Sequence, residues 1–320
     1  MNRKIAIITG ITGQDGPYLA ELLLKKNYKV IGILRESFSI NLSNLEYLGI
    51  KSKIIFDSCD LTNMVSVINL LNKYQPTEFY NLASQSSVGL SFSKPTETLN
   101  FNILSVVNIL ESIRLINKCI KFYQASSSEM FGSINDLPLT ENTVFNPVSP
   151  YGISKASAHW IVVNYRRAYG LYTTSGILFN HESILRGDNF IIKKVIKAAI
   201  DIKNNKQDIL EVGDIDIKRD FGYAPEYVEA MYLMMQNKNP DDYIICSGKS
   251  LSLREIIFYI FKHFEIDKNK IVINKNFFRP GEIRDIYGDS TKAKNKLGWN
   301  YNLNFLKVID MIIDEEVGKS

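Results

Sequence analysis

Tyr151 and Lys155 are the two side chains whose types and spacing point most directly to proton transfer in this sequence. They stand four residues apart at the start of a helix predicted over 151–169, so both face one side of it, one turn apart. A lysine ammonium beside a phenol favours the tyrosinate, and we therefore expect Lys155 to lower the pKa of Tyr151. Because the YxxxK spacing also arises by chance on exposed helices, its meaning depends on the residues around it.

Three serines and a glutamate, Ser126-Ser127-Ser128-Glu129, directly follow a strand predicted over 121–125. Ligands of open α/β sheets bind at the carboxyl ends of the strands, so this run should border a binding site. Ser127 could then hydrogen-bond a substrate hydroxyl beside Tyr151. For Glu129 the simpler alternative is a carboxylate at the start of a helix.

A glycine-rich turn follows the first apolar run, residues 4–9, and precedes a helical pattern over 18–24. Glycine lets the backbone turn tightly and approach a pyrophosphate, whose charge meets the helix N-terminus. The GxxGxxG spacing differs from GxGxxG and matches the short-chain dehydrogenase pattern; a plain strand-to-helix turn is the alternative. The turn predicts cofactor contacts from Gly10, Gly13, Gln14, Asp15 and Gly16.

The end of the second predicted strand bears on the choice between NADP and NAD. A cation there accommodates the 2′-phosphate of NADP, whereas an acidic residue accepts the ribose hydroxyls of NAD. Arg35 and Ser37 favour NADP, although Glu36 places a carboxylate near the phosphate and Arg35 alone could be a solvated surface cation. We predict NADP in preference to NAD. The further cofactor contacts predicted after the third and fourth strands are Asp60, Leu61, Leu82 and Ala83.

These segments need a scaffold, and the order of the patterns supplies one. Apolar runs of strand length alternate with amphipathic helical patterns up to about residue 178, which predicts βαβ units and a Rossmann-type, doubly wound parallel sheet. Beyond residue 180 the pattern becomes mixed, which predicts a smaller α/β substrate-binding lobe. We therefore divide the chain into a cofactor-binding domain, 1–179 with returning segments near 218–247, and a mainly nucleotide-sugar-binding lobe, 180–320. Helices are expected at 191–203, 225–236, 253–263 and 291–297.

Composition narrows the class of protein. The chain has 320 residues, of which 45% are hydrophobic and 22% charged, as in globular proteins. A net charge of +4 is too small and scattered to indicate nucleic-acid binding. Three widely spaced cysteines form neither a metal motif nor a disulfide framework, so we expect no metal and a reducing cytoplasm. No signal peptide is visible and the apolar runs fall short of the roughly 20 residues of a membrane helix, so we expect no membrane.

Taken in order, these motifs resemble the extended short-chain dehydrogenase/reductases and, more closely, the GDP-mannose 4,6-dehydratase family over nearly the full length. The combination of QDG at 14–16 and FNHES at 179–183 is distinctive, because ordinary epimerases of the superfamily would not be expected to carry both. Further segments that carry the likeness are NLASQSSVGLSF at 81–92, FYQASSSEMFG at 122–132, SPYGISK at 149–155, RDFGYAPEYVEAM at 219–231 and FFRPGEIRDIYGDSTKAKNKLGW at 277–299.

The resemblance implies a lyase that converts a GDP-hexose to its 4-keto-6-deoxy form. Tyr151 would take the O4 proton while a hydride leaves C4 for NADP, and Lys155 would also bind the nicotinamide ribose. Glu129 would remove the C5 proton, water would leave from C6, and the hydride would return there, so the cofactor is regenerated. A GDP-sugar 4-reductase or epimerase would need Ser127, Tyr151 and Lys155 but not Glu129. A non-enzymatic NADP-binding protein is the third alternative.

The resemblance also implies a GDP-sugar site. Cations would satisfy the phosphates and a carboxylate would accept guanine protons. Lys194 could equally be one of several solvated lysines, and His181 is expected to be a packed histidine rather than a catalyst. The implied substrate contacts are Ser87, Asn180, Lys194, Arg219, Arg279 and Glu282, in a homodimer or homotetramer.

Two departures from the family pattern affect the assembly and the sugar. Arg35, Glu36 and Asn44 stand where the family carries arginines that help to join subunits, which puts the tetramer in question. Ser87 and Gly89 stand where the mannose enzyme has histidine and alanine. If both face the sugar, the pocket would admit a bulkier one, such as a GDP-manno-heptose; neutral drift is the alternative. Because a methylene-scale contact changes selectivity by only about 1–3 kcal/mol, both sugars remain open.

Overall fold

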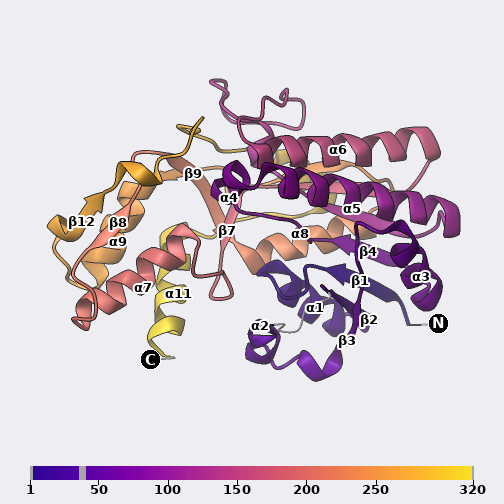
Figure 1. Ribbon diagram of the computed structural model, residues 1–320, viewed down its shortest axis with the longest axis horizontal. Coiled ribbons are helices and arrows are strands. Elements are labelled where there is room, and N and C mark those ends of the chain that lie inside the picture. Colours follow the sequence, from indigo (N-terminus) through magenta and orange to yellow (C-terminus); the bar gives the residue numbers. More distant parts are fainter. Residues whose placement is uncertain (1–2, 36–40, 319–320) are drawn as a thin grey trace.

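A seven-stranded, wholly parallel sheet forms the centre of the larger lobe in the computed structural model, which describes residues 3–35 and 41–318 (Figure 1). Its strand order is β10-β6-β5-β4-β1-β2-β3. Six of these strands fall where the sequence predicts them. The strands are β1 (Ile5–Thr9), β2 (Lys29–Leu34), β3 (Ile55–Ser58), β4 (Glu78–Asn81), β5 (Lys121–Ser127), β6 (Thr173–Leu178) and β10 (Asp242–Ile245).

Helices cover both faces of this sheet, which explains why its strands are apolar on both sides. Alternate residues of one strand enter different cores: Ile8 packs toward α1 and α8, whereas Ile7 packs toward α3, α5 and α6. The predicted doubly wound Rossmann-type architecture is confirmed. The helices of one face are α1 (Asp15–Lys25), α8 (Ala224–Gln236) and α10 (Thr291–Leu297), and those of the other are α3 (Met64–Tyr74), α5 (Pro95–Ile116) and α6 (Pro150–Tyr169).

Helix α5 is long and apolar enough, by length and composition, to cross a membrane, and it alone is so among the described helices. It packs between α3 and α6 against the sheet and buries polar side chains such as Thr98 and Asn102 together with Ile109 and Ile113. This is the position of a covering helix in the core of a doubly wound domain.

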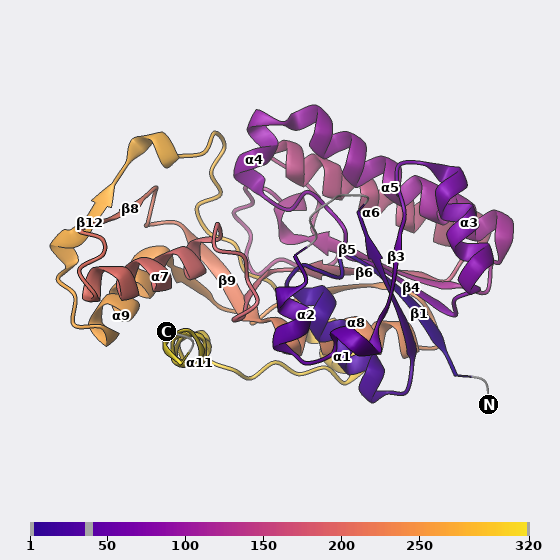
Figure 2. The same cartoon turned by 60° about the horizontal axis from the view of Figure 1, so that its bottom comes forward.

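The smaller lobe extends to one side of the sheet and has a separate core (Figure 2). It contains a three-stranded sheet in the order β11-β9-β7 and the pair β12-β8. The division at residues 179 and 180 stays a prediction; α8 and β10, which follow it in sequence, pack with the large sheet. The elements of this lobe are β7 (Asn180–Glu182), α7 (Ile191–Lys203), β8 (Leu210–Val212), β9 (Lys218–Tyr223), β11 (Ser250–Ser252), α9 (Leu253–His263), β12 (Ile271–Ile273) and α11 (Phe305–Val317).

Two short helices complete the larger lobe near the junction. These are α2 (Ser43–Tyr47) and α4 (Val88–Ser93), and α4 follows the end of β4. The carboxyl ends of β1, β4 and β5 are joined side by side, since Thr9 Oγ1 donates to Asn81 Oδ1 at 2.7 Å and Asn81 Nδ2 donates to Gln124 Oε1 at 2.9 Å. The loops that follow these strands therefore meet at one edge of the sheet, facing the smaller lobe.

Candidate active site

A cavity of about 1960 Å³ lies between the two lobes, at the carboxyl edge of the large sheet. Loops after β1, β4 and β5 form one wall, and β7, α7 and the segment around residues 277–282 form the other. Of the site residues predicted from the sequence, twenty line this cavity, and their roles stay predictions. They are Gly10, Gly13, Gln14, Asp15, Gly16, Arg35, Asp60, Leu61, Leu82, Ala83, Ser87, Ser127, Glu129, Tyr151, Lys155, Asn180, Lys194, Arg219, Arg279 and Glu282.

Helix α6 presents Tyr151 and Lys155 from its first turns. Ser149 caps this helix, with its hydroxyl accepting from the Gly152 amide at 3.0 Å, and Pro150 opens the first turn. A Cβ on Gly152 would lie 2.6 Å from the Glu129 carbonyl oxygen, so only glycine lets α6 pack this closely on the turn after β5. The catalytic candidates of β5 and α6 are thereby held together.

The protonation behaviour of Tyr151 differs from the prediction. Burial raises its pKa to about 12, although the hydrogen bond with Ser127 opposes this shift. Lys155 donates to the Ala125 carbonyl at 2.9 Å, and burial lowers its own pKa to about 8. The net pKa of Tyr151 is therefore raised, because desolvation of the phenol dominates and the Lys155 ammonium donates to a backbone oxygen. The lowering effect expected of Lys155 stays a prediction.

Glu129 lies in a single 3-10 turn, Ser128–Met130, directly after β5. Its backbone amide donates to Ser127 Oγ at 3.2 Å, which orients the turn. Its carboxylate makes no hydrogen bond or ion pair with any residue among 3–35 and 41–318. Burial raises its pKa, and the positive charges of Arg219 and Arg279 offset only part of this. Glu129 therefore combines an available oxygen with raised basicity.

The glycine turn after β1 has the shape that a dinucleotide pyrophosphate requires. Gly10 has φ +70°, and a Cβ there would lie 2.9 Å from the Leu82 carbonyl carbon. A Cβ on Gly16 would lie 2.5 Å from the Gly10 carbonyl oxygen, so the turn is closed against itself and against the end of β4. The amino end of α1 lines the cavity, and its unpaired amides and dipole favour an anionic group. These residues fit a nicotinamide dinucleotide.

The outer part of this cofactor region contains Arg35, whose guanidinium lies 4.9 Å from the centroid of the Phe101 ring. Glu36 and Ser37, which also entered the prediction of NADP, lie outside the described residues. Asp60 accepts hydrogen bonds from the Thr62 amide and hydroxyl at 2.9 and 2.7 Å. Its carboxylate thus shapes the turn after β3 as well as facing the cavity.

On the opposite wall, a charged pair joins two predicted substrate contacts. Arg219 donates to the Glu282 carboxylate at 2.8 Å and to the Ile283 carbonyl at 2.7 Å. Lys194 donates to the Glu211 carbonyl at 2.9 Å and lies 4.9 Å from the Phe277 ring, which fixes it to the wall rather than leaving it freely solvated. Two of the cations expected to meet the sugar diphosphate, Arg219 and Lys194, are thus held in place by contacts within the smaller lobe.

The two positions expected to enlarge the sugar pocket are not equivalent. Ser87 lines the cavity and caps α4, accepting from the Leu90 amide at 3.2 Å. Gly89 is exposed, is absent from the cavity wall, and a Cβ there would meet nothing within 4 Å. The expectation that Gly89 adds volume to the sugar pocket is therefore wrong, and any enlargement depends on Ser87.

Two features of the site were not predicted from the sequence. They are a cation beside the catalytic residues and a contact between two charged side chains far apart in the chain. Arg186 lines the cavity, stacks 3.6 Å from the Phe190 ring centroid, and lowers the pKa of Tyr151. His181 is buried, as expected of a packed histidine, yet its ring pairs with Asp15 at 3.0 Å. The joint presence of QDG and FNHES was the available indication, because these two segments contain the partners.

The family model described as GDP-mannose 4,6 dehydratase matches residues 7–312 of the chain. GDP-mannose 4,6 dehydratase 1 of Arabidopsis thaliana is 43% identical over 326 residues, covering 98% of this chain and 90% of that protein. GDP-mannose 4,6 dehydratase of Homo sapiens is 39% identical over 342 residues, covering 98% and 92%.

Solved structures share the fold at lower identity. DesIV, a dTDP-glucose 4,6-dehydratase from Streptomyces venezuelae with NAD and TYD bound, has a TM-score of 0.88 at 19% identity, covering 98% of this chain and 97% of that one. RMD from Pseudomonas aeruginosa complexed with NADPH has a TM-score of 0.81 at 22% identity, covering 99% of each chain. The structural likeness supports the fold, and the family match and close relatives establish membership. The chain belongs to the GDP-mannose 4,6-dehydratase family.

Proposed function

We propose that this protein is a GDP-sugar 4,6-dehydratase, a hydro-lyase that uses NADP catalytically. The observation that carries the proposal is Glu129: a carboxylate of raised pKa on the cavity wall, without a bonding partner among the described residues, beside Ser127 and Tyr151. A reductase or epimerase has no use for a carbon base at this position. The family membership of the chain supports the same activity.

Proton transfer at the sugar O4 is the role we propose for Tyr151. Ser127 and Arg186 both lower the pKa of its phenol, the direction that favours the proton-accepting tyrosinate, although burial raises the pKa by more. Bound NADP supplies the site that accepts the C4 hydride and returns it to C6. Lys155, with its pKa lowered to about 8, can hold a ribose hydroxyl and exchange a proton near neutral pH.

Glu129 acts on the 4-keto sugar. A ketone at C4 acidifies the C5 proton, and a carboxylate whose pKa is raised by burial is a stronger base for it than an exposed carboxylate. When Glu129 takes the C5 proton, the C5–H electron pair forms the C5–C6 double bond. The protonated Glu129 then gives that proton to the departing C6 hydroxyl, which leaves as water. Positioned acid–base groups of this kind contribute about 10²–10⁴-fold to the rate.

The nucleotide part of the substrate is assigned to the smaller lobe. Arg219 and Arg279 would balance the diphosphate charge, with Asn180 and Lys194 beside them, and Glu282 would accept guanine protons. The Arg219–Glu282 ion pair, at 2.8 Å, orients both side chains on one wall of the cavity. GDP-mannose and a GDP-manno-heptose both remain candidate substrates, and Arg35 supports NADP as the cofactor.

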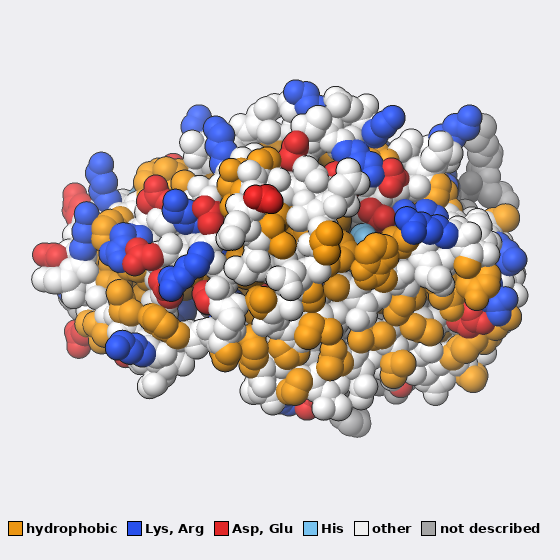
Figure 3. Space-filling view, turned by 90° about the horizontal axis from the view of Figure 1, so that it is seen from above, with side chains coloured by type: hydrophobic (Ala, Val, Ile, Leu, Met, Phe, Trp, Pro, Cys, Tyr) orange, Lys and Arg blue, Asp and Glu red, His pale blue; other side chains and the backbone are white. Residues whose placement is uncertain are grey.

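A homodimer or homotetramer is part of the proposal. Large apolar side chains exposed on the neighbouring helices α5 and α6 support it, because apolar groups gathered on one face mark association surfaces. They are Leu104, Leu115, Ile153 and Trp160. Figure 3 looks down on the side of the molecule that carries α6, where hydrophobic side chains gather over the middle and right of the view. The cytoplasmic location stays a prediction.

The decisive assay measures the product. The purified protein is incubated with NADP and either GDP-mannose or a GDP-manno-heptose, and mass spectrometry follows the loss of one water. We expect water loss from at least one of the two sugars, without net consumption of the cofactor. Stoichiometric conversion of the cofactor without water loss would instead support the 4-reductase, and an isomeric product of unchanged mass would support the epimerase.

A further inference from the structure

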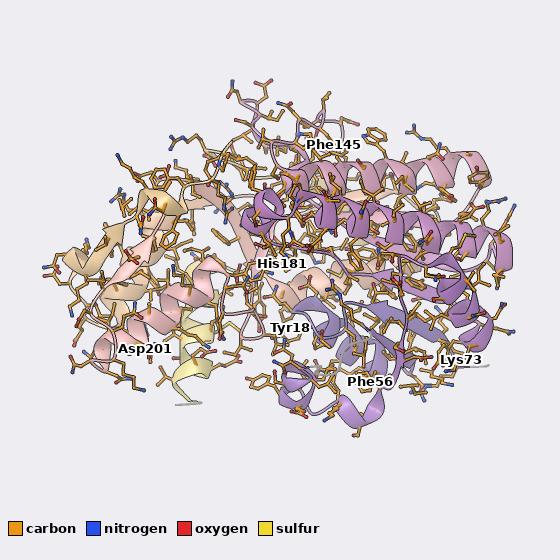
Figure 4. The ribbon with its side chains drawn as sticks, viewed as in Figure 1. Tyr18, Phe56, Lys73, Phe145, His181 and Asp201 are labelled. Atoms are coloured by element: carbon orange, nitrogen blue, oxygen red, sulfur yellow. The ribbon has the colours of Figure 1, made fainter. Side chains whose placement is uncertain are left out.

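Two segments far apart in sequence are joined by side-chain hydrogen bonds at the junction of the lobes. Gln14 Nε2 donates to the His181 carbonyl at 3.0 Å, and Ser183 Oγ donates to Gln14 Oε1 at 3.0 Å. His181 Nε2 lies 3.0 Å from both carboxylate oxygens of Asp15. We refer to Gln14, Asp15, His181 and Ser183 as the clasp. Figure 4 labels His181 near the middle of the molecule, where the smaller lobe joins the large sheet.

The central contact of the clasp is a buried ion pair. His181 Nδ1 lies 2.7 Å from the Phe179 carbonyl oxygen, and Nε2 faces the Asp15 carboxylate. Both partners only accept hydrogen bonds, so both ring nitrogens must carry protons and the ring is an imidazolium. Burial lowers the pKa of His181, but Asp15 and the Phe179 carbonyl raise it by more. Burial raises the pKa of Asp15, and the charges of His181 and Arg186 lower it by more.

Each half of the clasp belongs to the predicted site of a different ligand. Gln14 and Asp15 lie in the turn that would hold the cofactor pyrophosphate, at the amino end of α1. His181 and Ser183 frame β7, which begins at Asn180, the residue expected to meet the sugar diphosphate. The His181 ring also packs 4.7 Å from the Tyr227 ring of α8, so it cannot move independently of the larger lobe.

This arrangement has a thermodynamic consequence. A ligand that orders the glycine turn also fixes Asp15, and through the ion pair it fixes β7. The second ligand then meets a wall whose conformational freedom is already reduced, so it loses less entropy on binding. By linkage, the effect on affinity must be the same in either order of binding.

Resting on the function proposed above, we propose that the clasp couples the two binding events, with Asp15 and His181 as positioning residues through which NADP and the GDP moiety bind cooperatively. The coupling differs from the chemistry itself, because neither residue needs to contact the reacting atoms.

The test is a titration of the full-length protein with NADPH, with and without saturating GDP. For the wild type we expect GDP to tighten NADPH binding by at least about fivefold, the lower end of the range for coupled sites. In His181→Gln and in Asp15→Asn each ligand should still bind, but the coupling should fall to within about twofold of none. Ser183→Ala removes the hydrogen bond to Gln14 Oε1 and the one accepted from the Leu185 amide, but no charge. It should give an intermediate coupling and covers the case in which the charge variants fail to fold.

Asp216→Asn is the matched control, because Asp216 forms an exposed ion pair with Arg254 at 2.7 Å in the smaller lobe, outside the clasp. It should keep the full coupling. The coupling proposal is overturned if wild-type protein binds both ligands without mutual effect, or if His181→Gln and Asp15→Asn retain it. Wild-type protein that dehydrates a GDP-sugar but shows no coupling leaves the proposed function intact; protein that binds neither ligand overturns both proposals.

Discussion

Glu78 and Glu129 are carboxylates at opposite ends of neighbouring strands, and their surroundings differ in one decisive respect. Glu78, at the start of β4, is 1% exposed and accepts hydrogen bonds from the Tyr28 hydroxyl at 2.9 Å and the Tyr80 hydroxyl at 2.8 Å. Lys4 and Gln236 also donate to it, each at 3.3 Å. Glu129, after the end of β5, receives no side-chain or backbone donor from the described residues and faces the cavity.

The difference separates a structural carboxylate from a chemical one. Buried polar groups are nearly always hydrogen-bonded, as Glu78 is. The half-buried carboxylate of Glu129 instead lines the cavity without a protein partner among the described residues. At the amino edge of the sheet, four donors from separate segments of the chain surround the Glu78 carboxylate. At the carboxyl edge, where ligands of such sheets bind, Glu129 keeps its oxygens available for a substrate proton.

The largest expected effect is on the activity of Glu129→Gln. The amide keeps the size of the side chain but cannot accept the C5 proton, so kcat for dehydration should fall by roughly 10²–10⁴-fold. Water loss from the GDP-sugar, followed by mass spectrometry, measures it. Glu265→Gln, a change at an exposed pair with Lys203, is the control and should retain full activity. Wild-type turnover in Glu129→Gln would remove the distinction between the two carboxylates.

The next effect concerns the free energy of unfolding, which should depend on Glu78 and not on Glu129. Glu78→Leu removes the acceptor for the fully buried Tyr80 hydroxyl, which should cost about 1–3 kcal/mol of the free energy of unfolding. Glu129→Leu loses no protein hydrogen bond. Because the folded state raises the pKa of Glu129, ionisation at neutral pH opposes folding, and its removal should leave stability unchanged or increased. Chemical denaturation measures the free energy of unfolding of both variants. A larger loss of stability in Glu129→Leu than in Glu78→Leu would contradict the structural role assigned to Glu78.

A third prediction uses pH. Glu129 must be ionised to act as a base, and burial raises its pKa above the ordinary value of 4.5. Activity should therefore be lost as the pH falls through that raised pKa, at a higher pH than an exposed carboxylate would give. The profile of kcat against pH under saturating substrate measures this, and an acidic limb at or below 4.5 would show that Glu129 is not the titrating base.

The smallest expected effect is that of Arg279→Gln on the same profile. The positive charge of Arg279 lowers the pKa of Glu129, so its removal should move the acidic limb to higher pH. The displacement should stay below about one pH unit, which corresponds to about 1.4 kcal/mol. If the acidic limb and KM are both unchanged, Arg279 neither affects the pKa of Glu129 nor contributes to substrate binding.

Much of this scaffold is encoded locally and could be predicted from the sequence. The bounds of α7, α9 and α10 coincide with the expected ones. Strong amphipathic periodicity marks α7 and α9, and Gly298 marks the end of α10. Helix α11 was missed although its apolar residues recur at helical spacing after the capping residue Asn304. The six residues of α4 are too few to show a period.

The sequence was sufficient to predict most residues that line the site, but not their pKa shifts or ion pairs. Apart from Gly89, the described residues expected at the site line one cavity, since motifs at the ends of parallel strands must meet. The raised pKa of Tyr151 depends on burial by distant segments, and the pairing of His181 with Asp15 crosses 166 positions of sequence. Spacing alone cannot give either. The exposure of Gly89 likewise depends on the unpredicted helix α4.

The central claim is that Glu129 acts after C4 oxidation and on C5. The most direct test mixes Glu129→Gln with NADP and the GDP-sugar substrate in one turnover and follows the absorbance of reduced nicotinamide beside the mass of the sugar. The account predicts that reduced cofactor accumulates while the sugar keeps its water. Formation of the dehydrated sugar at the wild-type rate, or no cofactor reduction at all in a variant that binds both ligands, would contradict it.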